Sequence, residues 1–234
     1  MVVNPLPGLS LDLSYWNYDF RKLITLENVQ ALVDQNDPSK VIRDENGAVI
    51  FVVPSYVNLA GLQTSGLDFE VRHGFDLGRF GSLTSMLMAT YVHELRVPVA
   101  GGGTVNVPDS RNSTVTGAPP SVDWRGLARM QWERGPHSTG LSVRYTDSYR
   151  NDSTLVPPGV VIPPDNGTVD SFASVDVSYT YTFDEGFLGM SRSSVSAGAL
   201  NVFESRVPRT ADTVTLPFND MRGRVAWLRL TANF

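Results

Sequence analysis

The chain has 234 residues and a formal net charge of −5; 41% of its residues are hydrophobic, 10% aromatic and 18% charged. It contains no cysteine, which excludes a disulfide framework and any thiolate metal site or nucleophile. The acidic balance argues against a nucleic-acid partner, which normally requires a clustered basic face. No run of 18 apolar residues occurs, so the sequence excludes a transmembrane helix but leaves a transmembrane β-barrel open.

Residues 1–8 contain neither the basic region nor the apolar region of an export signal. From this segment alone, two interpretations remain: a cytoplasmic protein, or a piece of a longer one.

Beyond this segment, polar and apolar residues alternate along eight stretches, which predicts eight β-strands with two chemically different faces. The predicted strands span 9–20, 55–75, 82–97, 121–133, 138–150, 169–183, 194–205 and 222–234. Most are long enough to cross a membrane, which takes about 9–11 tilted residues. Only Glu27–Asp34, inside the first long connection, predicts a short helix.

Long and short connections alternate strictly between the predicted strands. Short links such as 76–81 and 134–137 have turn chemistry, whereas long links contain glycine and proline clusters such as Gly101–Gly103 and Pro157–Pro158. This order is typical of a barrel with tight turns at one end and large loops at the other. A β-sandwich with Greek-key connections does not normally sort its loops in this way.

The strand at 121–133 fits the thickness of a membrane. Its even positions are apolar or small between Trp124 and Trp132, and its odd positions include Arg125 and Arg129. The two tryptophans are separated by roughly 26 Å along the strand, or ~20 Å of height after tilting. That height approaches the ~25 Å apolar band that aromatic girdles flank. In a soluble sandwich the same two tryptophans would be core residues.

Five segments resemble the C-terminal part of TonB-dependent outer-membrane receptors. They are Pro7–Asp19, Tyr56–Phe69, Gly140–Tyr145, Ala197–Phe203 and Asp220–Phe234. The most specific are the Asn-Val-Phe sequence at 201–203 and the final strand, which begins Arg-Gly-Arg and ends in Phe234.

The resemblance implies an all-β fold: about eight long meander strands of an antiparallel barrel that has 22 strands in the family. Residues 1–234 would form the C-terminal portion of that barrel, without the plug domain, the TonB-contacting segment or a signal peptide. An eight-stranded set can also close into a small barrel of its own. The expected location is the bacterial outer membrane, with the short turns in the periplasm.

The resemblance also implies function and partners. The intact receptor would import a scarce nutrient, such as a siderophore, a cobalamin or an oligosaccharide, with TonB-coupled energy and without a cofactor. Its partners would be outer-membrane lipid, the plug and remaining strands, TonB through them, a small-molecule ligand, and the barrel assembly machinery, which would read Phe234. The alternatives are a self-contained passive or structural eight-stranded barrel and, third, a soluble β-sandwich binding module.

The alternation assigns side chains to a lumen and to a membrane interface. The lumen-facing candidates are Asp68, Glu70, Arg125, Arg129, Arg144, Asp176 and Arg229. They form either a solvated wall of paired charges or contacts to a plug or an anionic ligand. The aromatic girdle candidates are Trp124, Trp132, Tyr179, Tyr181 and Phe183. Tyr15, Trp16, Tyr18 and Phe20 are also expected in the girdle, with stacking on a ligand as the alternative.

No catalytic or metal-binding motif stands out. His73, His93 and His137 lie on different strands and turns without metal-ligand spacing. No nucleophile elbow or phosphate-binding loop occurs, and no pair of carboxylates is singled out by its spacing. We therefore expect neither enzymatic activity nor a bound metal.

Overall fold

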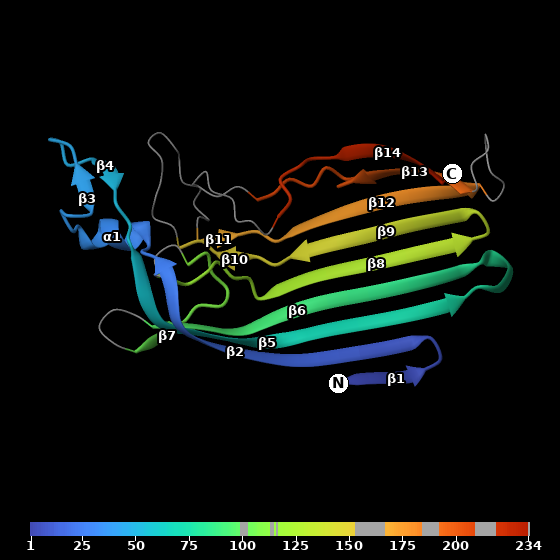
Figure 1. Ribbon diagram of the computed structural model, residues 1–234, viewed down its shortest axis with the longest axis horizontal. Coiled ribbons are helices and arrows are strands. Elements are labelled where there is room, and N and C mark those ends of the chain that lie inside the picture. The colour runs from blue at the N-terminus through green and yellow to red at the C-terminus, as the bar shows by residue number, and fades with distance from the viewer. Residues whose placement is uncertain are drawn as a thin grey trace.

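The computed structural model describes residues 1–98, 103–112, 115, 117–152, 167–183, 192–208 and 219–233. Within these ranges the chain forms one large antiparallel sheet, two small two-stranded sheets and one α-helix (Figure 1). No helix in the described part of the chain is both long and apolar enough to span a membrane.

The large sheet is a meander in which each strand pairs with its neighbours along the chain. Its strands are β1 (Val2–Leu6), β2 (Leu9–Leu26), β5 (Tyr56–Asp76), β6 (Ser82–Pro98), β8 (Trp124–Arg134), β9 (His137–Thr146), β12 (Phe172–Phe183), β13 (Arg192–Leu200) and β14 (Val225–Asn233). The short strand β7 (Thr104–Asn106) pairs with the end of β6. Among the described residues no ladder joins β14 to β1, so the sheet is open. The predicted all-β meander, a partial barrel, is confirmed.

The two ends of the sheet differ, as Figure 1 shows. Tight turns at Pro7–Gly8, Leu77–Gly81 and Gly135–Pro136 lie at one end, which we call the short-turn end. The helix and the small strands gather at the opposite end, the long-loop end.

The long-loop end holds most of the structure that the alternation did not predict. After β2, helix α1 (Val29–Gln35) is capped by Asn28, whose Oδ1 accepts the backbone N–H of Ala31 at 3.0 Å. A hairpin of β3 (Val41–Arg43) and β4 (Val49–Val52) follows. Lys40 donates to Glu27 at 2.5 Å, and this bond, together with the Ser55 N–H, lowers the pKa of Glu27.

Several predicted limits need correction. Strand β9 ends at Thr146 rather than at 150, and the strands predicted to begin at 121, 169 and 222 begin three residues later, at Trp124, Phe172 and Val225. Strand β2 continues to Leu26 rather than ending at Phe20, and β1 was not predicted. Strand β13 ends at Leu200 rather than at 205, because Asn201 adopts a left-handed conformation with φ 49°. The predicted helix is present but spans Val29–Gln35 instead of Glu27–Asp34.

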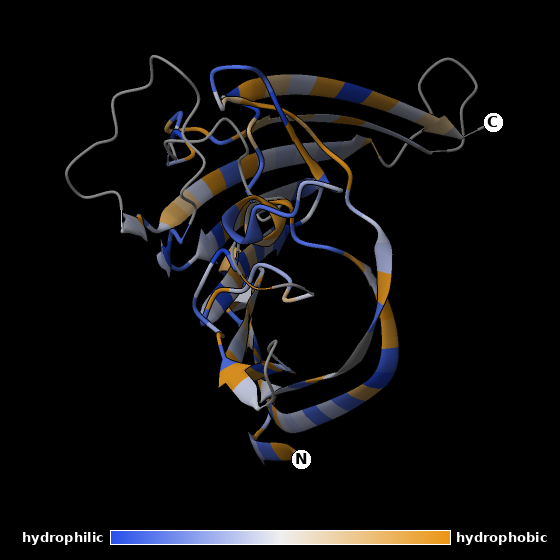
Figure 2. Ribbon diagram, turned by 90° about the vertical axis from the view of Figure 1, so that its left-hand side faces the viewer, coloured by the Kyte–Doolittle hydropathy of each residue, from blue (hydrophilic) through white to orange (hydrophobic). Residues whose placement is uncertain are grey.

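The strand register sorts side chains onto two faces of the sheet. One aligned row of cross-strand partners contains Leu13, Phe69, Ala89, Gly126, Tyr145 and Ala173, and we call this side the apolar face. The adjacent row, on the other side, contains Ser14, Asp68, Thr90, Arg125 and Thr146, and we call this side the polar face. Viewed from the long-loop end, the strands follow an arc (Figure 2).

Little of the apolar surface is buried. Both clusters of buried apolar residues lie at the long-loop end, one around Leu62, Leu95, Val97 and Val107, the other formed by Val122, Tyr149 and Val169. The second cluster joins the two-stranded sheet of β10 (Tyr149–Arg150) and β11 (Thr168–Val169). In contrast, Leu228 and Leu230 on the apolar face of β14 are 70% and 74% exposed. A β-sandwich would cover such residues with a second large sheet, and none is present in the described part.

Candidate functional site

The register places all seven lumen-facing candidates on the polar face. Asp68 and Arg125 belong to the row that defines this face, and Glu70 and Arg144 lie in the next row, which runs through Met88 and Leu127. Arg129 and Asp176 both pair with Ser142 on β9. Arg229 on β14 pairs with Ser196 on β13, and β13 is the second strand beyond β9. The candidates therefore share one side of the sheet and are spread over five strands, β5, β8, β9, β12 and β14.

Two hollows mark the polar face, each of about 450 Å³. The first lies over β2, β5, β6 and β8, and its lining includes Arg125 and the acidic residues Asp12, Asp68 and Glu70. Within it Thr90 donates to Asp68 at 2.7 Å, and Arg72 pairs with Glu70 next to it. The lining therefore contains one guanidinium and three carboxylates.

The second hollow lies over β6, β8, β9, β12, β13 and β14. Its polar lining includes Arg129, Gln131, Ser142 and Asp176, and Trp227 forms one side. Gln131 and Ser138 on neighbouring strands are joined by a hydrogen bond. Arg125 lines the first hollow and Arg129 lines the second, although both residues belong to β8.

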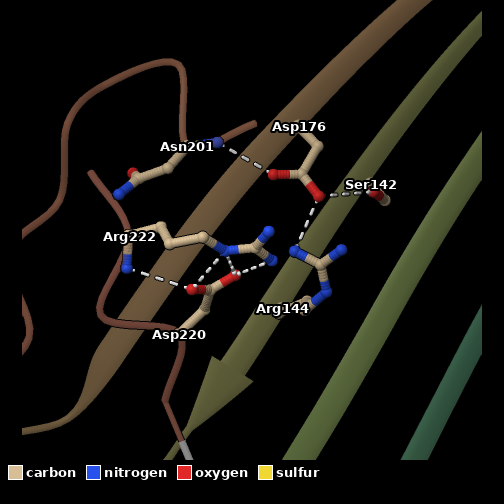
Figure 3. Close-up of polar contacts among 6 residues, drawn as sticks. All are labelled: Ser142, Arg144, Asp176, Asn201, Asp220 and Arg222. Atoms are coloured by element: carbon tan, nitrogen blue, oxygen red, sulfur yellow. Dashed lines mark hydrogen bonds and ion pairs between the residues drawn. The ribbon is translucent and has the colours of Figure 1, made fainter. Parts of the chain in front are cut away.

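Asp176 is the centre of a polar cluster beside the second hollow (Figure 3). It is only 7% exposed, and its Oδ2 accepts Arg144 at 2.6 Å and Ser142 at 3.5 Å. Its Oδ1 accepts the backbone N–H of Asn201 at 2.9 Å. Asp176 thereby attaches the connection after β13 to the wall of the sheet.

Asn201 turns the chain away from β13 at this point. Its side chain exchanges two hydrogen bonds of 2.8 Å with the backbone of Ser205, and the Val202 N–H donates to the Val175 carbonyl at 2.8 Å. The Asn-Val-Phe sequence noted above is therefore a turn in which asparagine serves as both donor and acceptor. Asparagine suits this position because it tolerates left-handed backbone angles.

Asp220 and Arg222 extend the cluster from the connection before β14 (Figure 3). The Arg222 guanidinium donates Nε and Nη2 to the Asp220 carboxylate at 2.9 Å and 2.6 Å. These bonds and the Arg222 backbone N–H lower the pKa of Asp220 to about 2. Neither residue was a predicted candidate, because sequence spacing could not show that this segment approaches β12.

The apolar face is bordered by aromatic side chains at both ends. Tyr15, Tyr91 and Trp124 lie in one row toward the long-loop end, where the rings of Tyr91 and Trp124 stack at 4.7 Å. Phe75, Trp132, Tyr179, Tyr181 and Phe183 lie on the same face toward the short-turn end. The five girdle candidates are thus divided between the two borders, with Trp124 at one and the others at the opposite one.

The alternation of β2 reverses at the long-loop border. Up to Tyr15 the apolar residues of β2 lie on the apolar face, but Trp16, Tyr18 and Phe20 lie on the polar face. Their rings follow one another at 5.9 Å and 6.0 Å, and Tyr18 and Phe20 are 55% and 46% exposed. We call these three residues the aromatic ladder. The girdle prediction fits the face of Tyr15 only; the other three rings lie on the opposite side of the sheet.

Three carboxylates meet at the long-loop end, near the start of β8. Burial first, and then the charges of Asp123 and Asp147, raise the pKa of Asp109; burial and Asp147 raise the pKa of Asp123. One oxygen each of Asp109 and Asp123 is buried without a hydrogen-bond partner among the described residues. Even so, no group of three His, Cys, Asp or Glu in the described part is arranged to hold a metal ion.

The histidines are dispersed over the sheet. His73 contacts Phe75, His93 lies 6.4 Å from the Tyr91 ring, and His137 bonds the Tyr179 hydroxyl through Nδ1 at 2.6 Å. The proposed assembly residue Phe234 lies outside the described residues.

A long antiparallel meander with one apolar face, aromatic borders and sorted turns is the wall of a membrane β-barrel. The family described as TonB dependent receptor-like, beta-barrel matches residues 3–202, and the chain belongs to this family. It is a family of outer-membrane receptors and transporters rather than of enzymes.

A solved structure with a similar fold is a doubly substituted form of the ferric enterobactin receptor PfeA from Pseudomonas aeruginosa. The match has a TM-score of 0.54 and 15% sequence identity, and it covers 98% of this chain and 29% of that receptor. The chain therefore spans less than a third of the receptor's length. A comparison with curated proteins finds no match.

Proposed function

We propose that this chain is the C-terminal part of the wall of an outer-membrane receptor that imports a scarce nutrient with TonB-coupled energy. The observation that carries this proposal is the reversal of β2 at Tyr15 and Trp16. Below the reversal one face of the sheet is apolar and the other polar, as contact with lipid on one side and a lumen on the other requires. Above it the aromatic ladder lies on the polar side, where an incoming ligand would arrive before it enters the barrel.

In this proposal the polar face lines the lumen and the apolar face contacts lipid. Arg125, Arg129, Arg144 and Arg229 then belong to an inner wall that a plug or an anionic ligand contacts, and Phe234 is the residue that the assembly machinery reads. The intact receptor supplies the plug, and through it TonB. The transported class is a ferric siderophore, a cobalamin or an oligosaccharide, bound without covalent chemistry.

Adjacent residues of β8 provide the test of the membrane faces. Ala128 lies on the apolar face and Arg129 on the polar face. We expect Ala128→Arg to reduce the amount of folded chain in the outer-membrane fraction several-fold, because an arginine facing mid-bilayer costs about 2–4 kcal/mol. Arg129→Ala is the matched change and should assemble normally. Equal assembly of both variants would contradict the assigned faces.

A second test addresses ligand capture by the aromatic ladder. Aromatic contacts contribute about 0.5–1.5 kcal/mol each, so Tyr18→Ala and Phe20→Ala should each weaken ligand binding roughly twofold to tenfold. Binding would be measured on cells for a ferric catecholate siderophore, cobalamin and a maltooligosaccharide. Tyr15→Ala, on the other face, is the control. Loss of binding in the control alone would place ligand contact elsewhere.

A further inference from the structure

Two arginines lie on the short-turn border of the apolar face. Arg134 follows Trp132 by two residues on β8, so both side chains are on the same face of the sheet. Arg79 belongs to the neighbouring turn, in the 3₁₀ segment η1 (Gly78–Phe80), and its guanidinium carbon lies 4.8 Å from the centre of the Phe80 ring. The two cations thus come from adjacent tight turns.

Direct contacts hold these two turns together. The Trp132 indole N–H donates to the Phe80 carbonyl at 2.9 Å. Gly81 passes so close to β8 that a Cβ at this position would lie 2.9 Å from the Arg134 Cβ. The relative placement of Arg79, Phe80, Trp132 and Arg134 is therefore fixed by backbone and indole contacts, while both guanidinium groups remain exposed.

These arginines differ from others in the chain in their partners. Six other arginines form ion pairs with carboxylates: Arg21, Arg72, Arg96, Arg144, Arg222 and Arg224. Within the residues that the structure describes, neither Arg79 nor Arg134 has an ion pair of this kind. Two exposed guanidinium groups without an ion pair favour an anionic partner.

The next hairpin continues this border. His137 pairs with Arg134 across the Gly135–Pro136 turn, and its ring lies edge-on to Tyr181 at 5.2 Å. Tyrosine and histidine at such a position combine an apolar body with a polar tip, as groups at a membrane interface do. The cations therefore lie between an apolar surface that accepts acyl chains and the aqueous side of the short turns.

We propose that Arg79 and Arg134 bind the phosphate of an anionic phospholipid, of the phosphatidylglycerol type, in the leaflet next to the short turns. The proposal rests on the membrane location proposed above. A guanidinium matches phosphate oxygens with paired donors, and the Phe80 ring occupies only one flat side of Arg79. The nearby carboxylates Asp76 and Glu133 both pair with Ser82 in a row of the polar face, so neither faces the ammonium of a zwitterionic headgroup on the apolar side. The adjoining apolar face favours a lipid over free phosphate.

The experiment uses the folded chain in dodecylmaltoside and counts bound dioctanoyl phosphatidylglycerol by native mass spectrometry. We expect tight binding of one lipid, and weaker binding of dioctanoyl phosphatidylcholine. Removing one interfacial cation weakens binding about fivefold, so Arg79→Ala with Arg134→Ala should weaken it roughly 25-fold. Arg21→Ala is the matched control at the opposite end, and it should leave lipid binding unchanged.

A second pair of variants guards against a folding defect. Arg79→Lys with Arg134→Lys keeps both charges but removes the paired donors, so its affinity should lie between those of the parent chain and the alanine variant. Equal affinity for the two lipids, unchanged binding in the alanine variant, or equally tight binding of inorganic phosphate would overturn the proposal.

Flotation of the chain with phosphatidylcholine vesicles separates this proposal from the membrane assignment. A chain that does not float with these vesicles would contradict the membrane location itself. A chain that floats but shows no preference for phosphatidylglycerol would contradict only the lipid site.

Discussion

At the scale of single residues, Asp176 connects segments that are far apart in sequence. One carboxylate accepts a guanidinium from β9 and a backbone N–H from the turn at Asn201. A buried carboxylate needs such partners, because an unpaired one is costly to remove from water. Asp176 therefore fixes where β13 ends and where the connection to β14 begins.

We expect Asp176→Ala to destabilise the folded chain by about 1–3 kcal/mol, since it leaves the Asn201 N–H without its acceptor. The destabilisation should stay below the about 3–5 kcal/mol that breaking a fully buried ion pair costs. The Arg144 side chain is half exposed, so water can hydrate its guanidinium once the carboxylate is removed. Urea unfolding in detergent measures the change, and hydrogen exchange at 201–205 should rise with it. Asp220→Ala, at an exposed carboxylate, is the control. An equal effect of both substitutions would contradict the special role of Asp176.

The Asp176 cluster also shows the limit of reasoning from sequence at this scale. Alternation along 169–183 placed Asp176 on the polar side, and the Asn-Val-Phe sequence was noted as specific. The bond between them could not be predicted, because it joins residues 25 positions apart through a turn with a left-handed asparagine. Arg222 and Asp220 were missed for the same reason, since no local pattern positions their segment.

At the scale of elements, two strands accommodate a tryptophan over a glycine on the polar face. The Trp16 ring covers Gly66 on β5, and the Trp227 ring covers Gly198 on β13. A Cβ at Gly66 would lie 2.3 Å from the Trp16 ring and 2.2 Å from the Tyr91 carbonyl oxygen. The register of β5 and β6 shifts at this position, so the ring fills the space where the strand bends.

We predict that Gly66→Ala destabilises the chain by about 1–3 kcal/mol, because both close atoms must move. Gly74→Ala on the same strand is the matched control, since a Cβ there meets nothing within 4 Å. The readout is the temperature at which the folded chain in detergent loses its heat-modifiable migration. A similar decrease for both variants would show that strand propensity, rather than the Trp16 contact, sets the cost.

Sequence periodicity was sufficient for the long strands and insufficient beyond the long-loop border. The long strands could be predicted because an apolar face and a polar face of one sheet impose a period of two. Past Tyr15 the phase of β2 reverses, so the period of two predicts an end at Phe20 although the strand continues to Leu26. Short strands such as β3 and β7 have only three residues each, and their pairing depends on the loops around them.

At the scale of the whole molecule, the sheet has two edges without a partner in the described part of the chain. Strand β14 pairs only with β13, and the N-terminal segment pairs with β2 no further than Leu13. An unpaired edge presents free N–H and C=O groups to any strand that meets it. In an intact barrel these are the edges to which further strands would add.

Hydrogen exchange of the isolated chain in detergent should report these edges. Alternate amides of β14 point away from β13, and we expect them to exchange roughly tenfold faster or more than amides of β8, which is paired on both sides. Co-assembly with the remaining strands of a receptor should slow them. Equal protection of β14 and β8 in the isolated chain would indicate that the edge has already found a partner.

The two aromatic borders have a consequence for the choice of bilayer. Leu67 and Phe75, Tyr91 and Leu83, and Trp124 and Trp132 are each eight residues apart on paired strands. This spacing corresponds to ~20 Å of height, whereas an average hydrocarbon core is about 30 Å thick. Each ångström of hydrophobic mismatch costs a fraction of a kcal/mol. In the proposed membrane location the chain is therefore matched to a thin bilayer, and a thicker bilayer would accommodate it less well.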